Sequence, residues 1–132
     1  MVREYEKYFR TPSTLPYRRI EMPSTFKQRV IEELNRLARY YPNGAFSIVY
    51  LKVTRSDGSN VPDYLHNSIL NAIERSVRAS DVIGHNDKLY FLLLPYTDRE
   101  GARKVSKKLK NNIESLDDLV VTTGFEEIRL KR

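Results

Sequence analysis

The chain has 132 residues, a length that suits one domain with a buried core. Hydrophobic residues make up 40% of it and charged residues 30%, and there is no cysteine. This composition is typical of a globular protein and excludes disulfides, thiol catalysis and cysteine-based zinc sites. The sequence has no apolar run of about 18 residues that could span a membrane. Its charged, aromatic start does not resemble a secretion signal, so we expect a cytoplasmic protein.

The formal net charge is +6, from 23 basic and 17 acidic residues. A basic balance of this size favours an anionic partner, such as a nucleotide or a nucleic acid. The basic residues are spread along the chain, however, so a solvated basic surface explains them at least as well.

The first part of the chain is rich in proline, at Pro12, Pro16 and Pro23. Proline interrupts helices and favours extended backbone. We therefore expect a lead-in and linker over residues 1–23, followed by a single domain over residues 24–132.

Residues 26–40 carry apolar side chains at helical spacing, with Ser24 or Thr25 as a suitable N-cap. Pro42-Asn43-Gly44 ends this predicted helix. Residues 45–53 are mostly apolar, β-branched or aromatic, which predicts a central strand.

The remaining predicted elements follow in order. They are a helix that begins at Pro62, a hairpin over residues 82–95, a helix capped by Thr97 or Asp98, a central strand over 119–123 and an edge strand over 126–130. Without the first helix, the order is βαββαβ. We therefore predict an α+β fold, a two-layer α/β sandwich. Its ferredoxin-like core is an antiparallel sheet with helices on one face, and the N-terminal helix is extra.

Four short motifs carry a family resemblance by their order and spacing. They are Leu15-Pro16-Tyr17-Arg18-Arg19, Arg78-Ala79-Ser80-Asp81, the run from Leu92 to Asp98 with Gly101-Ala102, and Val121-Thr122-Thr123-Gly124. Together they resemble GGDEF domains, the diguanylate cyclases, over residues 11–125. The resemblance implies an enzyme that joins two GTP molecules into cyclic di-GMP around a metal held by carboxylates.

At the catalytic positions that the resemblance implies, this chain is degenerate. Lys52 stands where the metal-binding acid belongs, and a protonated lysine cannot ligate Mg²⁺. Asp63 matches a guanine-binding aspartate, but Pro62 replaces the glycine before it. The hairpin signature keeps neither glycine and is one residue short, so it aligns to within one position with Asn86, Asp87, Lys88, Leu89 and Tyr90. In this alignment Leu89 replaces the second carboxylate. We therefore expect no catalytic residue, no metal, no cofactor and no cyclase activity.

One functional pattern survives, in Arg78 and Asp81. The resemblance implies the product-inhibition site of the family, in which the arginine grips guanine and phosphate and the aspartate accepts guanine N–H groups. Arg75, one helical turn earlier, is a candidate second guanidinium. This site would make the chain a cyclic di-GMP receptor. The structural alternative is that Arg78 ends a helix and Asp81 caps the following turn.

Other functions remain open. Numerous tyrosines favour a protein partner or a homodimer. Residues 88–91, Lys-Leu-Tyr-Phe on a central strand, also resemble RNA-recognition sheets. The glycines and spaced aromatics of that signature are missing, so a nucleic-acid-binding domain is the weaker alternative, and an unrelated enzyme on the same fold is weaker still. His66 and His85 lack a paired acid or nucleophile, and we expect His66 to be a partly buried structural residue.

Overall fold

The computed structural model of the chain describes residues 20–21, 23–86 and 89–130, so most of the predicted lead-in lies outside it. In chain order, its elements are β1 (Ile20–Glu21), α2 (Pro23–Tyr40), β2 (Phe46–Arg55), α3 (Asp63–Ser76), β3 (Val82–Asn86), β4 (Leu89–Leu94), α4 (Arg99–Glu114) and β5 (Leu119–Ile128). The series from β2 to β5 is the βαββαβ order that the sequence predicts.

The strands form one sheet in the order β1-β3-β4-β2-β5. Neighbouring strands are antiparallel, except that β1 runs parallel to β3. This arrangement confirms the α+β, ferredoxin-like fold class. The prediction of a central strand over 119–123 and a separate edge strand was wrong, because β5 is one strand at the sheet edge. Gly124 does not interrupt it, since the ring of Tyr50 on the paired strand lies across that glycine.

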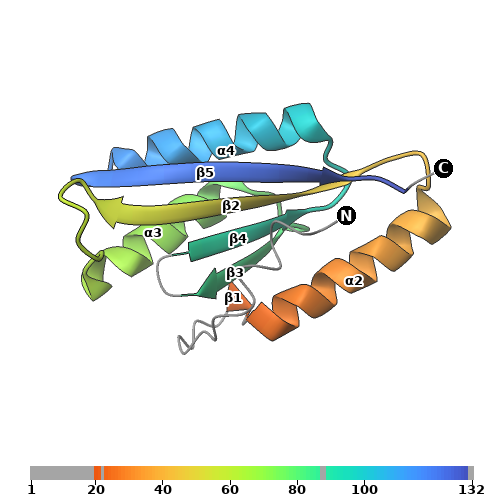
Figure 1. The fold of residues 1–132 in the computed structure, drawn as a ribbon, viewed down its shortest axis with the longest axis horizontal. Coiled ribbons are helices and arrows are strands. Elements are labelled where there is room, and N and C mark those ends of the chain that lie inside the picture. The colour runs from red at the N-terminus through yellow and green to blue at the C-terminus, as the bar shows by residue number, and fades with distance from the viewer. Residues whose placement is uncertain (1–19, 22, 87–88, 131–132) are drawn as a thin grey trace.

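Helices cover both faces of the sheet (Figure 1). Successive side chains of β2 point to opposite faces. Leu51 and Val53 belong to a core with α3 and α4, whereas Phe46 and Ile48 belong to a core with α2. The strand is therefore apolar on both sides, which explains its nearly continuous apolar sequence. On the face opposite α3 and α4, α2 adds a layer to the expected two-layer core.

Tyr90 and Phe91, the aromatic pair considered for base stacking, are both fully buried. Tyr90 belongs to the core under α3 and α4. Phe91 faces α2, where its ring centroid lies 5.8 Å from that of Phe26. Because a helical layer covers each ring, these two side chains do not form an RNA-stacking surface.

The helix starts differ from the predicted ones by one or two residues. Since α2 begins at Pro23, Ser24 and Thr25 lie inside its first turn instead of capping it. Pro62 is the N-cap of α3 rather than its first residue. The start of α4 is as predicted, because Asp98 accepts a hydrogen bond from the amide of Gly101 at 2.8 Å.

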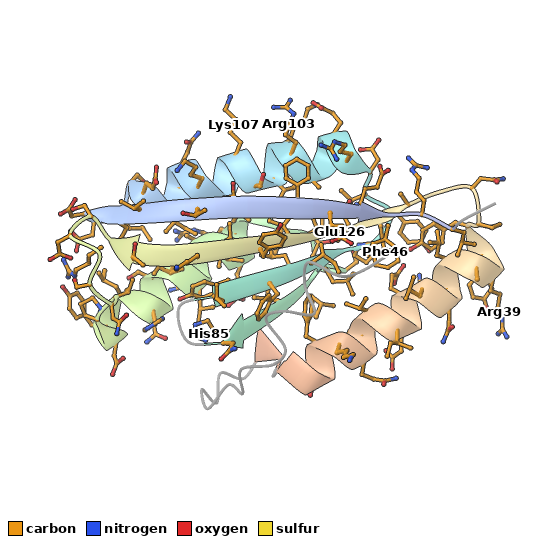
Figure 2. All side chains as sticks on the ribbon, in the orientation of Figure 1. Arg39, Phe46, His85, Arg103, Lys107 and Glu126 are labelled. Atoms are coloured by element: carbon orange, nitrogen blue, oxygen red, sulfur yellow. The ribbon has the colours of Figure 1, made fainter. Side chains whose placement is uncertain are left out.

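The outer face of α4 is basic. Arg103 and Lys107 point away from the sheet (Figure 2), and Lys104 and Lys108 lie beside them. Arg103 pairs with Glu100 at 2.6 Å. These side chains supply part of the net positive charge as a solvated surface. Within the described ranges, no helix is both long and apolar enough to cross a bilayer.

Candidate functional site

A pocket of about 670 Å³ opens at the end of the sheet where β2 begins and β4 ends. Its walls come from the α2–β2 loop, the α3–β3 turn, the β4–α4 turn and the chain just after β5. Arg78 and Asp81 both line it. The structure therefore places the two predicted RxxD residues in a concave site.

Arg78 lies beyond α3 rather than at its end, which corrects the helical interpretation of this position. The helix ends at Ser76, and its C-cap Val77 is already extended, with φ of −120° and ψ of 164°. The Nη2 atom of Arg78 donates hydrogen bonds to the carbonyl oxygen of Pro95 at 2.7 Å and to Oγ1 of Thr97 at 2.8 Å. These bonds fasten the α3–β3 turn to the β4–α4 turn.

The rest of the Arg78 guanidinium remains available. Its side chain is 57% exposed, and all of its hydrogen bonds to described residues leave from Nη2. Nε and Nη1 therefore offer N–H donors to a ligand in the pocket. A guanidinium held by one nitrogen and open at the others is a preorganised donor for phosphate or for a base edge.

The carboxylate of Asp81 is buried, with the side chain only 3% exposed. Its Oδ2 accepts a hydrogen bond from the backbone amide of Arg78 at 2.8 Å, and Oδ1 accepts from Nη2 of Arg78 at 3.4 Å. The amide of Asp81 in turn donates to the carbonyl of Arg78 at 3.0 Å. Both carboxylate oxygens are thus engaged in the turn, as the structural alternative for Asp81 describes.

Arg75 is exposed in the last turn of α3 and is not among the residues that line the pocket. The pocket wall instead includes Tyr41, Tyr96 and Arg129, which sequence reasoning missed. Tyr96 directly follows a predicted strand, and an aromatic residue in a turn is a signal that could have drawn attention to it. Tyr41 and Arg129 are distant from Arg78 in sequence, so no local spacing shows their approach.

The predicted remnants of a catalytic centre lie toward the other end of the sheet. Lys52 pairs with Leu89, and Leu89 pairs with Asn86, so three of these positions form one row across the sheet. Thr122 on β5 continues the row. Lys52 is exposed, Leu89 is half-buried and Asn86 is buried. The other two hairpin residues, Asp87 and Lys88, lie outside the described residues.

The row offers an ammonium, an aliphatic group, an amide and a hydroxyl. Mg²⁺ prefers carboxylate oxygens in protein sites, and neither Lys52 nor Leu89 supplies one. In the part of the chain that the structure describes, no three or more histidine, aspartate or glutamate side chains are grouped to hold a metal ion. These residues therefore do not fit the carboxylate-held ion that the family resemblance implies.

Asp63 is the first residue of α3 and is exposed. Because α3 packs on the face opposite the Lys52 side chain, Asp63 is not part of the row. No hydrogen bond or ion pair joins Asp63 to Lys52 in the described chain. The nearby carboxylate instead acts on His66, whose pKa is lowered by burial and raised to a smaller extent by Asp63.

A buried polar cluster lies between α3 and the sheet. Nδ1 of His66 and the hydroxyl of Tyr90 share a hydrogen bond of 2.8 Å. The ring of His85 lies 4.4 Å from that of Tyr90 and 5.4 Å from that of His66, between centroids. His66 is 8% exposed and His85 is 1% exposed. The expectation of a structural histidine at position 66 fits this geometry. The contact of His85 with Tyr90 depends on the register between β3 and β4, which the sequence alone does not show.

No family model matches the sequence, and no curated protein matches it. The fold does match solved structures. The diguanylate cyclase SiaD of Pseudomonas aeruginosa, solved with its activator SiaC, shares 20% identity at a TM-score of 0.68, over 83% of this chain and 47% of that one. This chain thus spans about half the length of SiaD in that structure.

Two further structures from Pseudomonas aeruginosa are similar. One is a variant of TpbB, also called YfiN, comprising only the GGDEF domain, with 15% identity, a TM-score of 0.68 and 79% and 69% of the two chains covered. The other is PelD in complex with c-di-GMP, with 20% identity, a TM-score of 0.52 and 77% and 39% covered. At these identities, the likeness establishes the architecture. In its fold, this chain is a GGDEF-like domain.

Proposed function

We propose that this chain is a GGDEF-like signalling domain that binds cyclic di-GMP in the Arg78 pocket and does not synthesise it. The observation that carries the proposal is the Arg78 guanidinium. It is anchored through Nη2 in a concave site and has Nε and Nη1 open to a ligand. A fork of this kind binds phosphate or the acceptor edge of guanine through two parallel hydrogen bonds.

Two further facts support binding at this place. The pocket, at about 670 Å³, is within the range typical of small-molecule sites. PelD, which shares the fold, has been solved in complex with c-di-GMP. The dinucleotide carries two phosphates and two purines, which suits a site that combines a cation with aromatic side chains.

The non-catalytic half of the proposal rests on the Lys52 row. Phosphoryl transfer of this kind depends on metal ions that neutralise developing charge. An exposed ammonium and a half-buried aliphatic side chain offer no ligand for such an ion. The loss of electrostatic stabilisation at a reacting phosphate typically costs orders of magnitude in rate.

Calorimetric titration of the full chain with cyclic di-GMP tests the receptor half. We expect saturable binding by the wild type and a loss of about 10- to 100-fold for Arg78→Ala, since hydrogen bonds to charged groups are at stake. Arg78→Lys keeps the charge but loses the fork, so it should also bind weakly. Arg103→Ala removes the same charge from the outer face of α4 and should bind as the wild type does. No saturable binding by the wild type contradicts the proposal.

Thr97→Val tests whether Arg78→Ala weakens binding by removing a ligand contact or by distorting the turn. It removes one anchor of the Arg78 side chain and leaves the guanidinium in place. If Thr97→Val weakened binding as much as Arg78→Ala, a distorted turn would explain both losses. We expect Thr97→Val to retain most of the affinity.

The claim that the chain does not synthesise cyclic di-GMP is tested by incubating it with GTP and Mg²⁺ and separating the nucleotides by chromatography. We expect no cyclic di-GMP. Any turnover above that of a heat-treated sample would refute this half and leave the receptor half standing.

A protein partner is the second candidate function. Tyr40 and Tyr64 are 67% and 68% exposed, and tyrosine is enriched at protein interfaces. Light scattering with and without cyclic di-GMP shows whether the chain self-associates and whether the ligand alters its mass. Binding of short RNA that weakens steeply with salt would instead support the nucleic-acid alternative.

A further inference from the structure

Tyr96 stands out in the pocket wall because its backbone and its side chain are both unusual. Among the described residues, it is the one non-glycine residue with positive φ, at 56°. Its side chain is nonetheless large and 57% exposed. A non-glycine residue in this conformation costs free energy and persists only where its surroundings hold it. An exposed tyrosine in such a position therefore needs an explanation beyond packing.

Contacts from α2 and from Tyr41, the residue that follows this helix, hold the Tyr96 ring. The rings of Tyr96 and Tyr41 are in contact in a tilted arrangement, with centroids 4.3 Å apart and planes 34° from parallel. The hydroxyl of Tyr96 accepts a hydrogen bond of 2.8 Å from Nη2 of Arg36. Arg36 pairs with Glu33 at 3.3 Å, and the hydroxyl of Tyr41 donates to the same carboxylate. Each member of the set thus fixes another, and together they fix the orientation of the Tyr96 ring.

The backbone on either side of Tyr96 is fixed as well. Nη2 of Arg78 bonds to the carbonyl of Pro95 and the hydroxyl of Thr97, the two neighbours of Tyr96. Behind Tyr41, Gly44 leaves room for the ring, because a Cβ at that glycine would lie 2.8 Å from Cδ2 of Tyr41. The guanidinium that we propose as the hydrogen-bond donor to a phosphate or a base therefore also fixes the backbone that carries the Tyr96 ring.

We propose that Tyr96, supported by Tyr41, is a stacking platform for a purine base of the nucleotide that Arg78 binds. This inference rests on the proposed function and adds how the site recognises a base. One face of the Tyr96 ring contacts Tyr41, and the exposure of the side chain leaves ring surface open to a planar ligand. Because both oxygens of Asp81 are engaged in the turn, stacking rather than an acidic side chain provides the base contact.

Affinity measurements on Tyr96 variants test the platform. Asparagine tolerates positive φ, so Tyr96→Asn removes the ring without adding backbone strain. We expect its affinity for cyclic di-GMP to fall by roughly 10- to 100-fold, the range typical of a lost base–aromatic stack. Tyr96→Phe keeps the ring and loses the bond from Arg36, so it should bind within about 3-fold of the wild type. Tyr64→Asn, at the opposite end of α3, is the matched control and should bind as the wild type does.

A fluorescence readout reports stacking directly. The chain contains no tryptophan, so Tyr96→Trp introduces a single one. We expect cyclic di-GMP to quench its emission as a purine stacks on the indole, and to leave the emission of Tyr64→Trp unchanged. Thermal unfolding of each variant checks that it is folded.

The outcomes separate this inference from the proposed function. If the wild type binds through Arg78 and Tyr96→Asn binds equally well, the platform is wrong and the receptor proposal stands. If Tyr96→Phe loses as much affinity as Tyr96→Asn, the ring face is not the contact and the platform is likewise overturned. If the wild type does not bind cyclic di-GMP, the receptor proposal fails. Titration of Tyr96→Trp with GTP then decides the platform, which quenching supports and unchanged emission overturns.

Discussion

The end of the sheet where β2 begins and the region around Lys52 carry different kinds of side chain. At the first end, Arg78 keeps an open guanidinium edge, and Tyr96 exposes an aromatic ring in a pocket. Toward the other end, the paired residues Lys52 and Leu89 offer an ammonium and an aliphatic side chain, and neither supplies a carboxylate. Phe46 and Lys52 mark the two regions on β2, about 20 Å apart at roughly 3.4 Å per residue.

Behind the Lys52 row, the sheet is packed and hydrogen-bonded rather than open. His66, His85 and Tyr90 form a buried cluster on the opposite face, and Asn86 is buried in the row itself. Residues in this region therefore contribute to stability. The comparison teaches that one end of the sheet carries a concave, charged site, whereas the region around Lys52 is backed by a packed polar cluster. Substitutions in the two regions should accordingly affect different measurements.

The largest effect on stability is expected from Gly84→Ala on β3. An added Cβ would lie 2.9 Å from Cδ1 and 3.2 Å from Cγ of Phe26, a fully buried side chain that α2 packs against the sheet. Because this ring belongs to the buried core on the α2 side of the sheet, the extra methyl overpacks that core, and we expect a loss of about 1–3 kcal/mol of unfolding free energy, measured by urea denaturation. Val120→Ala is the control, since Val120 on β5 is 42% exposed and its truncation leaves no buried cavity. Affinity for cyclic di-GMP should stay unchanged in both.

Tyr90→Phe should have the next largest effect on stability. It leaves Nδ1 of buried His66 without the hydroxyl that lies 2.8 Å from it. An unsatisfied buried polar atom costs about 1–3 kcal/mol, which urea denaturation resolves. Tyr64→Phe removes a hydroxyl that lies 3.3 Å from Arg55 at an exposed site, and it should change stability by less than about 0.5 kcal/mol. Equal losses in both variants would contradict a specific role for the buried cluster.

The same cluster predicts a pH dependence of stability. Burial lowers the pKa of His66 below its ordinary value of 6.5, so the unfolded chain binds this proton more readily than the folded chain. The unfolding free energy should therefore fall as the pH drops through 6.5 toward the folded pKa. His66→Gln should flatten this part of the profile, in urea titrations at about pH 7.5 and about pH 5.5. An unchanged slope in the variant would show that His66 is not the group responsible.

Local patterns made much of the fold predictable from the sequence. The apolar run of β2 and the Asp98 cap of α4 depend on residues close in sequence, and both are present. The face that α2 covers and the continuation of β5 through Gly124 depend on packing against other elements. No local rule specifies that Tyr50 lies across this glycine.

The candidate sites also combine residues that short sequence motifs indicate with residues that only the packing of distant elements brings together. Arg78 and Asp81 belong to one four-residue motif and were singled out by its resemblance to the family's motif, and the role of Asp81 in the turn was the structural alternative. Tyr41 and Tyr96 meet only because the α2–β2 loop and the β4–α4 turn converge. Lys52, Leu89 and Asn86 lie in one row because of strand register, and their match to the catalytic positions of the family stays a prediction.

Lys52→Asp is expected to have the smallest effect and tests the comparison most directly. The residue is exposed on the sheet, so the substitution should change the unfolding free energy by less than about 0.5 kcal/mol. It places an acid where the family resemblance implies one, but the paired residue Leu89 offers no oxygen ligand, and a single exposed carboxylate does not hold Mg²⁺ firmly. We therefore expect no cyclic di-GMP from GTP in a chromatographic assay, the same result as for Lys107→Asp, which makes an equal charge change on the outer face of α4. Formation of cyclic di-GMP by Lys52→Asp but not by Lys107→Asp would contradict this expectation. It would mean that the region around Lys52 lacks a single catalytic side chain, so that the two regions differ in function by one residue.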